Sequence, residues 1–81
     1  MDAYTLKEKK DTQEFHLFKG RMTTEGCTSN LSSICKEMTK SESSRNIFSC
    51  KDEDDARVRC ATIGRQVCGT CVSHLYESYN K

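Results

Sequence analysis

The sequence has few of the residues that build a hydrophobic core. It contains no Trp, three Phe and three Tyr, and hydrophobic residues, with Cys counted among them, make up only 35% of its 81 residues. Charged residues make up 31%. A chain of this size buries about 60–65% of the surface that its unfolded form exposes, and ordering it costs roughly 1–2 kcal/mol per residue in backbone entropy. A core of ordinary side chains would be marginal, which favours cross-links by disulfides or metal ions.

The sequence also lacks the signals of several functions. No apolar run is long enough to cross a membrane. The formal net charge is +1, with acidic and basic residues interspersed, so there is no basic stripe of the kind that binds nucleic acid. A glycine-rich phosphate loop, an H-E-x-x-H motif and a carboxylate–histidine–nucleophile spacing are absent. We therefore expect a protein that is not an enzyme and has neither a nucleic-acid partner nor a membrane span.

Cysteine, by contrast, is abundant. An even number of cysteines in a chain this short is typical of a disulfide framework whose pairing the spacing cannot choose. A bridge that closes a loop of ~15 residues contributes ~3 kcal/mol, so three bridges would secure a marginal fold. We expect three disulfides, with the pairing open, among the six cysteines Cys27, Cys35, Cys50, Cys60, Cys68 and Cys71.

Disulfides form in oxidising compartments, so this framework predicts a secreted, extracellular protein. The segment Met1–Lys7 has no apolar core of the kind found in a signal peptide, and we expect that such a peptide has already been removed. Asn30-Leu31-Ser32 is a glycosylation sequon, which is compatible with secretion.

The first half of the chain predicts one strand and one helix. Residues 1–13 are polar, and we expect a flexible N-terminal arm, followed by a single cysteine-rich domain over 14–81. The apolar run Phe15–Phe18 predicts a strand within 14–22, in which His16 is an ordinary buried or edge side chain. An amphipathic helix with Cys35 pointing inward is predicted by the i, i+3, i+4 and i+7 spacing of Leu31, Ile34, Cys35 and Met38.

The second half predicts a strand, a helix and a closing strand. Residues 45–50 read as a short strand. The acidic run from Asp52 and the arginines that follow it predict a helix that ends at Gly64. Residues 66–79 are rich in β-branched and aromatic side chains, which favours one or two further strands. The expected fold is therefore α+β, a small two-layer sandwich of two helices on a short β-sheet, stapled by disulfides.

Cys68-Gly69-Thr70-Cys71 is a C-x-x-C motif with two chemical interpretations. A redox dithiol is usually placed at a helix N-terminus directly after a strand, and the predicted order here is the reverse. As part of a zinc site, the motif belongs to a C-x9-C-x7-C-x2-C-x2-H pattern with enough soft ligands for tetrahedral coordination. The alternative cofactor is therefore zinc, bound by Cys50, Cys60, Cys68, Cys71 and His74.

This region resembles the B-box zinc fingers, particularly those of plants. The resemblance rests on Cys50, on Ala56–Cys60 and on Val67–Cys71. The family opens with C-x-x-C, whereas Glu53 stands at the second ligand position here. What the resemblance implies is an intracellular zinc-binding module for protein interaction.

Over residues 14–79 the order of elements and cysteines resembles the killer toxins of smut fungi and the plant-pathogen effectors that share their fold. The resemblance implies a secreted, non-catalytic, toxin-like effector or virulence protein, which binds a protein or cell-surface component of a host or competitor. We expect a monomer without a cofactor, and the candidate binding surface includes Tyr76 and Tyr79.

Overall fold

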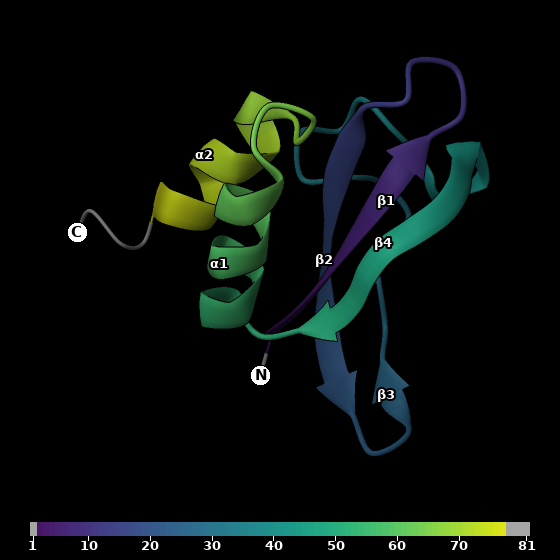
Figure 1. The fold of residues 1–81 in the computed structure, drawn as a ribbon. Helices are drawn as coiled ribbons and strands as arrows, with labels where there is room; N and C mark the ends of the chain where they lie inside the picture. Colours follow the sequence, from purple (N-terminus) through teal and green to yellow (C-terminus); the bar gives the residue numbers. More distant parts are fainter. Residues whose placement is uncertain (1, 78–81) are drawn as a thin grey trace.

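The computed structural model describes residues 2–77, which form a curled four-stranded antiparallel sheet with two α-helices against one face (Figure 1). The strand order is β3-β2-β1-β4. This arrangement confirms the α+β fold class, with two helices packed on a small sheet. The elements are β1 (Asp2–Lys9), β2 (Phe15–Thr23), β3 (Gly26–Cys27), a 3-10 helix (Lys40–Glu42), β4 (Ser43–Lys51), α1 (Glu53–Ile63) and α2 (Gly69–Glu77).

β1 is a central strand, so the expected N-terminal arm is wrong for residues 2–9. β1 pairs with β2 on one side and with β4 on the other. Four consecutive residues, from Ala3 to Leu6, are buried. The polar composition of the segment hid this role, because a central strand is stabilised by pairing and packing against distant segments rather than by its own composition.

Three predicted elements are confirmed within a few residues of their expected bounds. They are β2, β4 and α1. The Asp52 carboxylate caps α1 by accepting a hydrogen bond from the Asp55 amide at 2.8 Å. The helix ends at Gly64, whose φ of 83° is readily adopted by glycine.

The predicted helix over residues 31–38 is wrong. Residues 28–39 instead follow an irregular path beside β2, and Leu31, which was expected to be buried, is 78% exposed. The amides of Thr28, Asn30 and Ile34 donate to carbonyl groups of β2. These long-range hydrogen bonds take the place of the helical ones, which sequence periodicity alone could not show.

The predicted strands over residues 66–79 are also wrong, because residues 69–77 form α2. Cys68, Cys71, Val72 and Leu75 stand at i, i+3, i+4 and i+7, and this face packs into the main core. The helical period was therefore present, but the β-branched and aromatic composition outweighed it in the prediction. The core of the described chain combines both helices with the sheet and contains Tyr4, Leu6, Phe15, Leu17, Phe48, Ala56, Cys60, Val67, Cys68, Cys71 and Leu75.

Arg57 is the charged residue that joins the two helices. Its buried guanidinium donates to the Leu75 carbonyl oxygen, at 3.3 Å from Nε and 3.2 Å from Nη2. The same group forms ion pairs with Glu53 at 2.8 Å and Asp54 at 3.0 Å. A buried charge is costly unless it is paired and hydrogen-bonded, and these partners satisfy that need.

Gly20 tests whether the 28–39 segment must lie directly against β2. A Cβ at this position would lie 1.8 Å from the Thr28 carbonyl oxygen, a backbone atom that cannot rotate away. We expect Gly20→Ala to lower the free energy of unfolding by about 1–3 kcal/mol in urea titrations. Gly69→Ala is the matched control, since nothing lies within 4 Å of its Cβ, and it should stabilise the protein by up to about 1 kcal/mol. Equal effects of the two substitutions would contradict the close approach.

Candidate metal centre

Two distant segments meet at one end of β2, and each is held there by backbone hydrogen bonds. The Ile34 amide donates to the Leu17 carbonyl oxygen at 2.8 Å. Further along the same edge, the Phe15 amide donates to the Gln66 carbonyl oxygen and the Cys68 amide donates to the Phe15 carbonyl oxygen. His16 lies between these anchored positions. As a result, Cys35, which follows Ile34, and the C-x-x-C motif, which begins at Cys68, both lie beside the same histidine.

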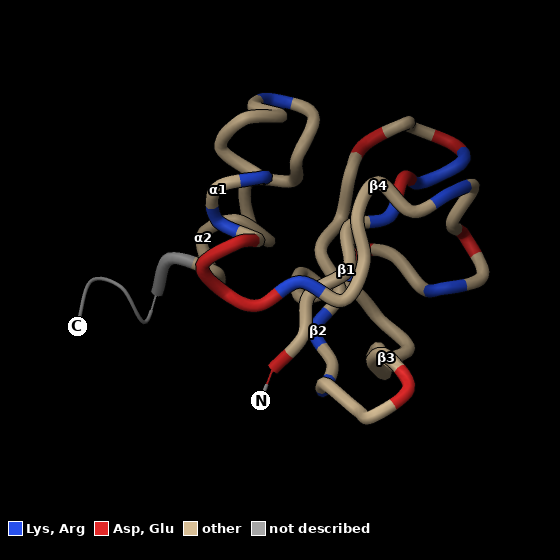
Figure 2. Tube along the Cα trace, turned by 60° about the horizontal axis from the view of Figure 1, so that its bottom comes forward, with Lys and Arg blue, Asp and Glu red and all other residues tan. Residues whose placement is uncertain are grey.

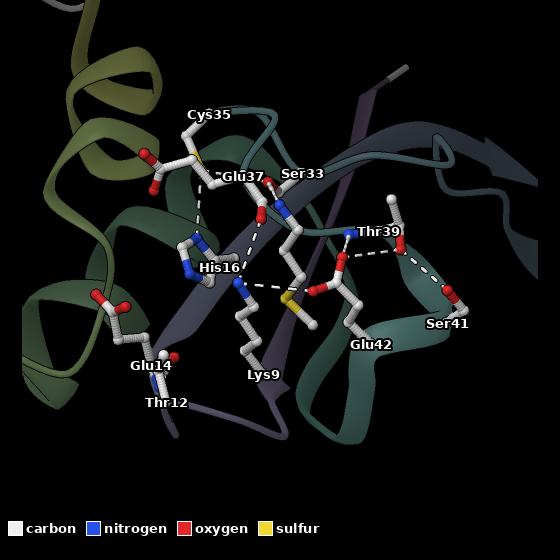
Figure 3. A network of polar contacts seen from close by, with 11 residues as sticks. Lys9, Thr12, Glu14, His16, Ser33, Cys35, Glu37, Thr39, Ser41 and Glu42 are labelled. Carbon is white, nitrogen blue, oxygen red and sulfur yellow. Dashed lines mark hydrogen bonds and ion pairs between the residues drawn. The ribbon is translucent and has the colours of Figure 1, made fainter.

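The side chains of His16, Cys35, Cys68 and Cys71 form a compact group of four metal-binding residues, which we call the Cys3His group. One donor atom from each lies within 4.8 Å of all the others. His16 Nδ1 is 3.2 Å from Cys35 Sγ, the contact drawn in Figure 3, and 4.0 Å from Cys71 Sγ. In a tetrahedral zinc site the donor atoms lie about 3.5–3.8 Å apart, given Zn–S bonds of ~2.3 Å and Zn–N bonds of ~2.0 Å. The spacing of the group is close to that arrangement.

The Cys3His group is shielded from solvent. His16 and Cys71 are 1% and 0% exposed, Cys68 is 9% exposed, and Cys35 is partly exposed. The Ser33 hydroxyl lies 3.2 Å from Cys35 Sγ and positions this outermost thiol. Four protein donors around one point leave little room for a substrate or water, which is typical of a structural metal site.

The pKa values of two of the thiols are shifted in opposite directions. Burial raises the pKa of Cys71 to about 12, so without a cation this residue is a neutral thiol at pH 7. Burial also acts to raise the pKa of Cys35, but hydrogen bonds, with that of the Ser33 hydroxyl foremost, outweigh it and hold the pKa below its ordinary value. A bound cation would supply the charge that a buried Cys71 thiolate needs.

The five zinc ligands predicted from the sequence are not brought together. Cys68 and Cys71 belong to the Cys3His group, whereas Cys50 forms a disulfide with Cys27. Cys60 is buried in the main core and His74 lies on an exposed face of α2, both outside the group.

His16 and Cys35, which the sequence analysis did not assign to the metal, complete the group. His16 is separated from the C-x-x-C motif by about fifty residues of sequence, so no local spacing could have found it.

The structure contains one disulfide rather than the expected three. Cys27 in β3 is bonded to Cys50 in β4, while Cys35, Cys60, Cys68 and Cys71 are thiols. The even count misled the prediction because the cysteines divide into a pair, a set of three that shares a histidine, and a single core residue. β3 and β4 are the two outer strands of the sheet, so the disulfide joins the two edges of the curl.

The C-x-x-C motif does begin a helix, contrary to the order expected from the sequence. Cys68 directly precedes α2 and Cys71 lies in its first turn. A dithiol that exchanges disulfides with another molecule needs an accessible thiolate, whereas both of these residues are buried. Their positions suit a metal site better than an exchange reaction.

The sequence also predicted a binding surface that includes Tyr76 and Tyr79. Tyr76 lies in the last turn of α2, while Tyr79 lies outside the described residues. Neither helix of the described chain has the length and apolar character to cross a bilayer. Acidic residues gather at the start of α1, and basic and acidic positions alternate along the loops of the sheet (Figure 2).

Comparisons with protein-family models, curated proteins and solved structures found no match to this chain. They therefore bear on neither the killer-toxin nor the B-box resemblance. The function has to be inferred from the residues and their geometry.

The burial and the pKa shifts of the thiols predict how fast each reacts in the metal-free protein. Cys35 should be alkylated first by iodoacetamide at about pH 7.5, because the thiolate is the nucleophile. Burial raises the pKa of Cys60 to about 11 and of Cys71 to about 12, so both should react at least ~100-fold more slowly. Peptide mass spectrometry at timed intervals measures the order. In urea the four thiols should react at similar rates, and early labelling of Cys60 or Cys71 in the native protein would contradict this assignment.

Proposed function

We propose that this chain is a small zinc-stabilised protein-binding module, in which one Zn²⁺ is held by His16, Cys35, Cys68 and Cys71. The observation that carries the proposal is the convergence of these four donors within 4.8 Å of one another. Three thiolates and one imidazole are a typical ligand set for structural zinc, and their number matches tetrahedral coordination. The metal would act as a structural brace, and binding would be the task of the surface.

The position of the Cys3His group supports a structural role for the metal. It connects β2, the irregular 28–39 segment and α2, which also contact one another through backbone hydrogen bonds and through the main core. The 28–39 segment has little secondary structure of its own. In a small chain with a marginal core, a metal that fixes three separate segments supplies folding free energy that side-chain packing does not.

Exposed apolar side chains support the binding role. Leu31, on the 28–39 segment, is 78% exposed, and Val58, on α1, is 65% exposed. Leu31 and Ile34 line an open groove together with Lys19 and Lys36. Ile34 directly precedes the ligand Cys35, so the shape of this groove would depend on the metal.

The first test is metal content and its effect on stability. Protein produced with zinc should carry one Zn²⁺ per chain, and free zinc at a thousandfold excess over Kd should stabilise the fold by about 4 kcal/mol. Replacement by Co²⁺ should give the visible absorption bands of a tetrahedral thiolate site. Native mass spectrometry and thermal unfolding with and without a chelator make these measurements.

Single substitutions identify the ligands. His16→Ala and Cys71→Ser should each weaken zinc binding at least ~100-fold. Even substitution of residues that only hydrogen-bond to metal ligands lowers metal affinity about 10–100-fold, and loss of a ligand should have a larger effect. His74→Ala and Cys60→Ser are matched controls, because these residues stand outside the Cys3His group. Loss of zinc in the His74 variant, or full retention in the His16 variant, would contradict the proposed site.

The disulfide favours a second candidate function, a secreted binding protein of the effector or toxin-like class. A stable Cys27–Cys50 bond requires an oxidising compartment. The bond lies beside Met22, at the far end of β2 from the Cys3His group, so both cross-links can exist in one molecule. In this interpretation the exposed side chains of Leu31 and Val58 would contact a host or competitor component.

Removing the disulfide separates the two cross-links. The bond spans 23 residues of sequence, and the double variant Cys27→Ser, Cys50→Ser should lose about 3 kcal/mol of unfolding free energy in urea titrations. Its zinc content should stay at one per chain. Unchanged stability would show that the disulfide does not stabilise the native fold. Loss of zinc would show that the disulfide and the zinc site depend on each other.

A further inference from the structure

The three thiols of the Cys3His group differ in how readily an oxidant can reach them. Cys71 is fully buried and Cys68 is 9% exposed, whereas Cys35 is partly exposed and sits on the irregular 28–39 segment. The sulfurs of Cys35 and Cys71 lie within 4.8 Å of each other. A partly exposed sulfur therefore lies close to a fully buried one.

Resting on the proposed zinc site, we infer that the Cys3His group is a peroxide-sensitive switch, in which formation of a Cys35–Cys71 disulfide releases the metal. The oxidant is a hydroperoxide, here hydrogen peroxide. Both sulfurs are ligands, so a covalent bond between them removes two of the four donors at once. Only His16 and Cys68 then remain, too few to hold zinc tightly.

The chemistry has two balanced steps. The Cys35 thiolate attacks the peroxide, an S–O bond forms, the O–O bond breaks and one hydroxide leaves, which gives a sulfenic acid. The Cys71 thiolate then attacks that sulfur, an S–S bond forms, the S–O bond breaks and a second hydroxide leaves. The two thiolates lose two electrons, the peroxide gains them, and Zn²⁺ departs with its charge unchanged.

The structural consequence differs from that of chelation. The new bond joins the 28–39 segment to α2, two of the three elements that the metal connects. A covalent link therefore replaces the metal brace while His16 and Cys68 become free. The fold should persist after oxidation, although simple removal of zinc weakens it, and a thiol reductant should restore the zinc site.

The experiment begins with zinc-loaded protein and adds hydrogen peroxide in stepwise equivalents beside a colorimetric zinc indicator. We expect about one zinc released for each disulfide formed, a denatured mass lower by two hydrogens, and a midpoint of thermal unfolding above that of the chelated protein. Tryptic mapping should link the peptide that ends at Lys36 to the C-terminal peptide that begins at Gln66, and fragmentation should place the link at Cys71. Dithiothreitol and fresh zinc should reverse the change.

Cys60→Ser is the control, since it removes a buried thiol outside the group and should leave the release curve unchanged. Three results would overturn the switch: zinc retained after oxidation, release with a Cys68–Cys71 bond instead, or release through sulfinic acid without any disulfide. Protein that binds no zinc before peroxide is added would instead refute the proposed function, so the two failures are distinct.

Discussion

Backbone hydrogen bonding along the outer edge of β2 is the constraint on which the rest of the structure depends. β3 covers this edge for only two residues. Toward the start of β2, the same edge is covered by the 28–39 segment and by the residues around Val67. An uncovered edge exposes unpaired donors and acceptors, so these contacts complete the sheet as well as place the side chains beside it. The Cys3His group exists because both covering segments pass beside His16.

The cysteines at the two ends of β2 have different structural roles. At one end, the Cys27–Cys50 bond joins the outer strands of the curled sheet. At the other end, three thiols share one histidine. Cys60 does neither and packs as a small apolar side chain in the main core. A small protein thus has one cross-link for the sheet and a candidate second one for the segments that cover it.

The helices depend on the sheet in different ways. α1 carries its own start and stop, in the Asp52 cap and Gly64, and it follows β4 directly. α2 is held by its apolar face, by the C-x-x-C motif at its beginning and by Arg57, which donates to the Leu75 carbonyl oxygen near its end. Any metal at the Cys3His group would therefore act on α2 more than on α1.

The sequence by itself determined the elements whose signals are local. The apolar run of β2, the acidic start of α1 and its terminal glycine are each visible in a short stretch of sequence, so β2, α1 and the α+β class could be predicted. So could the need for cross-links, which follows from chain length and composition. The C-x-x-C motif also indicated half of the candidate site, because two ligands three residues apart are visible without any fold.

Only the tertiary structure decided the rest, because it depends on contacts between distant residues. β1 is central owing to its two neighbours, and residues 28–39 are irregular because their amides bond to β2 instead of to one another. His16 and Cys35 join Cys68 and Cys71 through those same contacts. A count of six cysteines carries no information on which sulfurs meet, since that depends on the path of the backbone that brings them together.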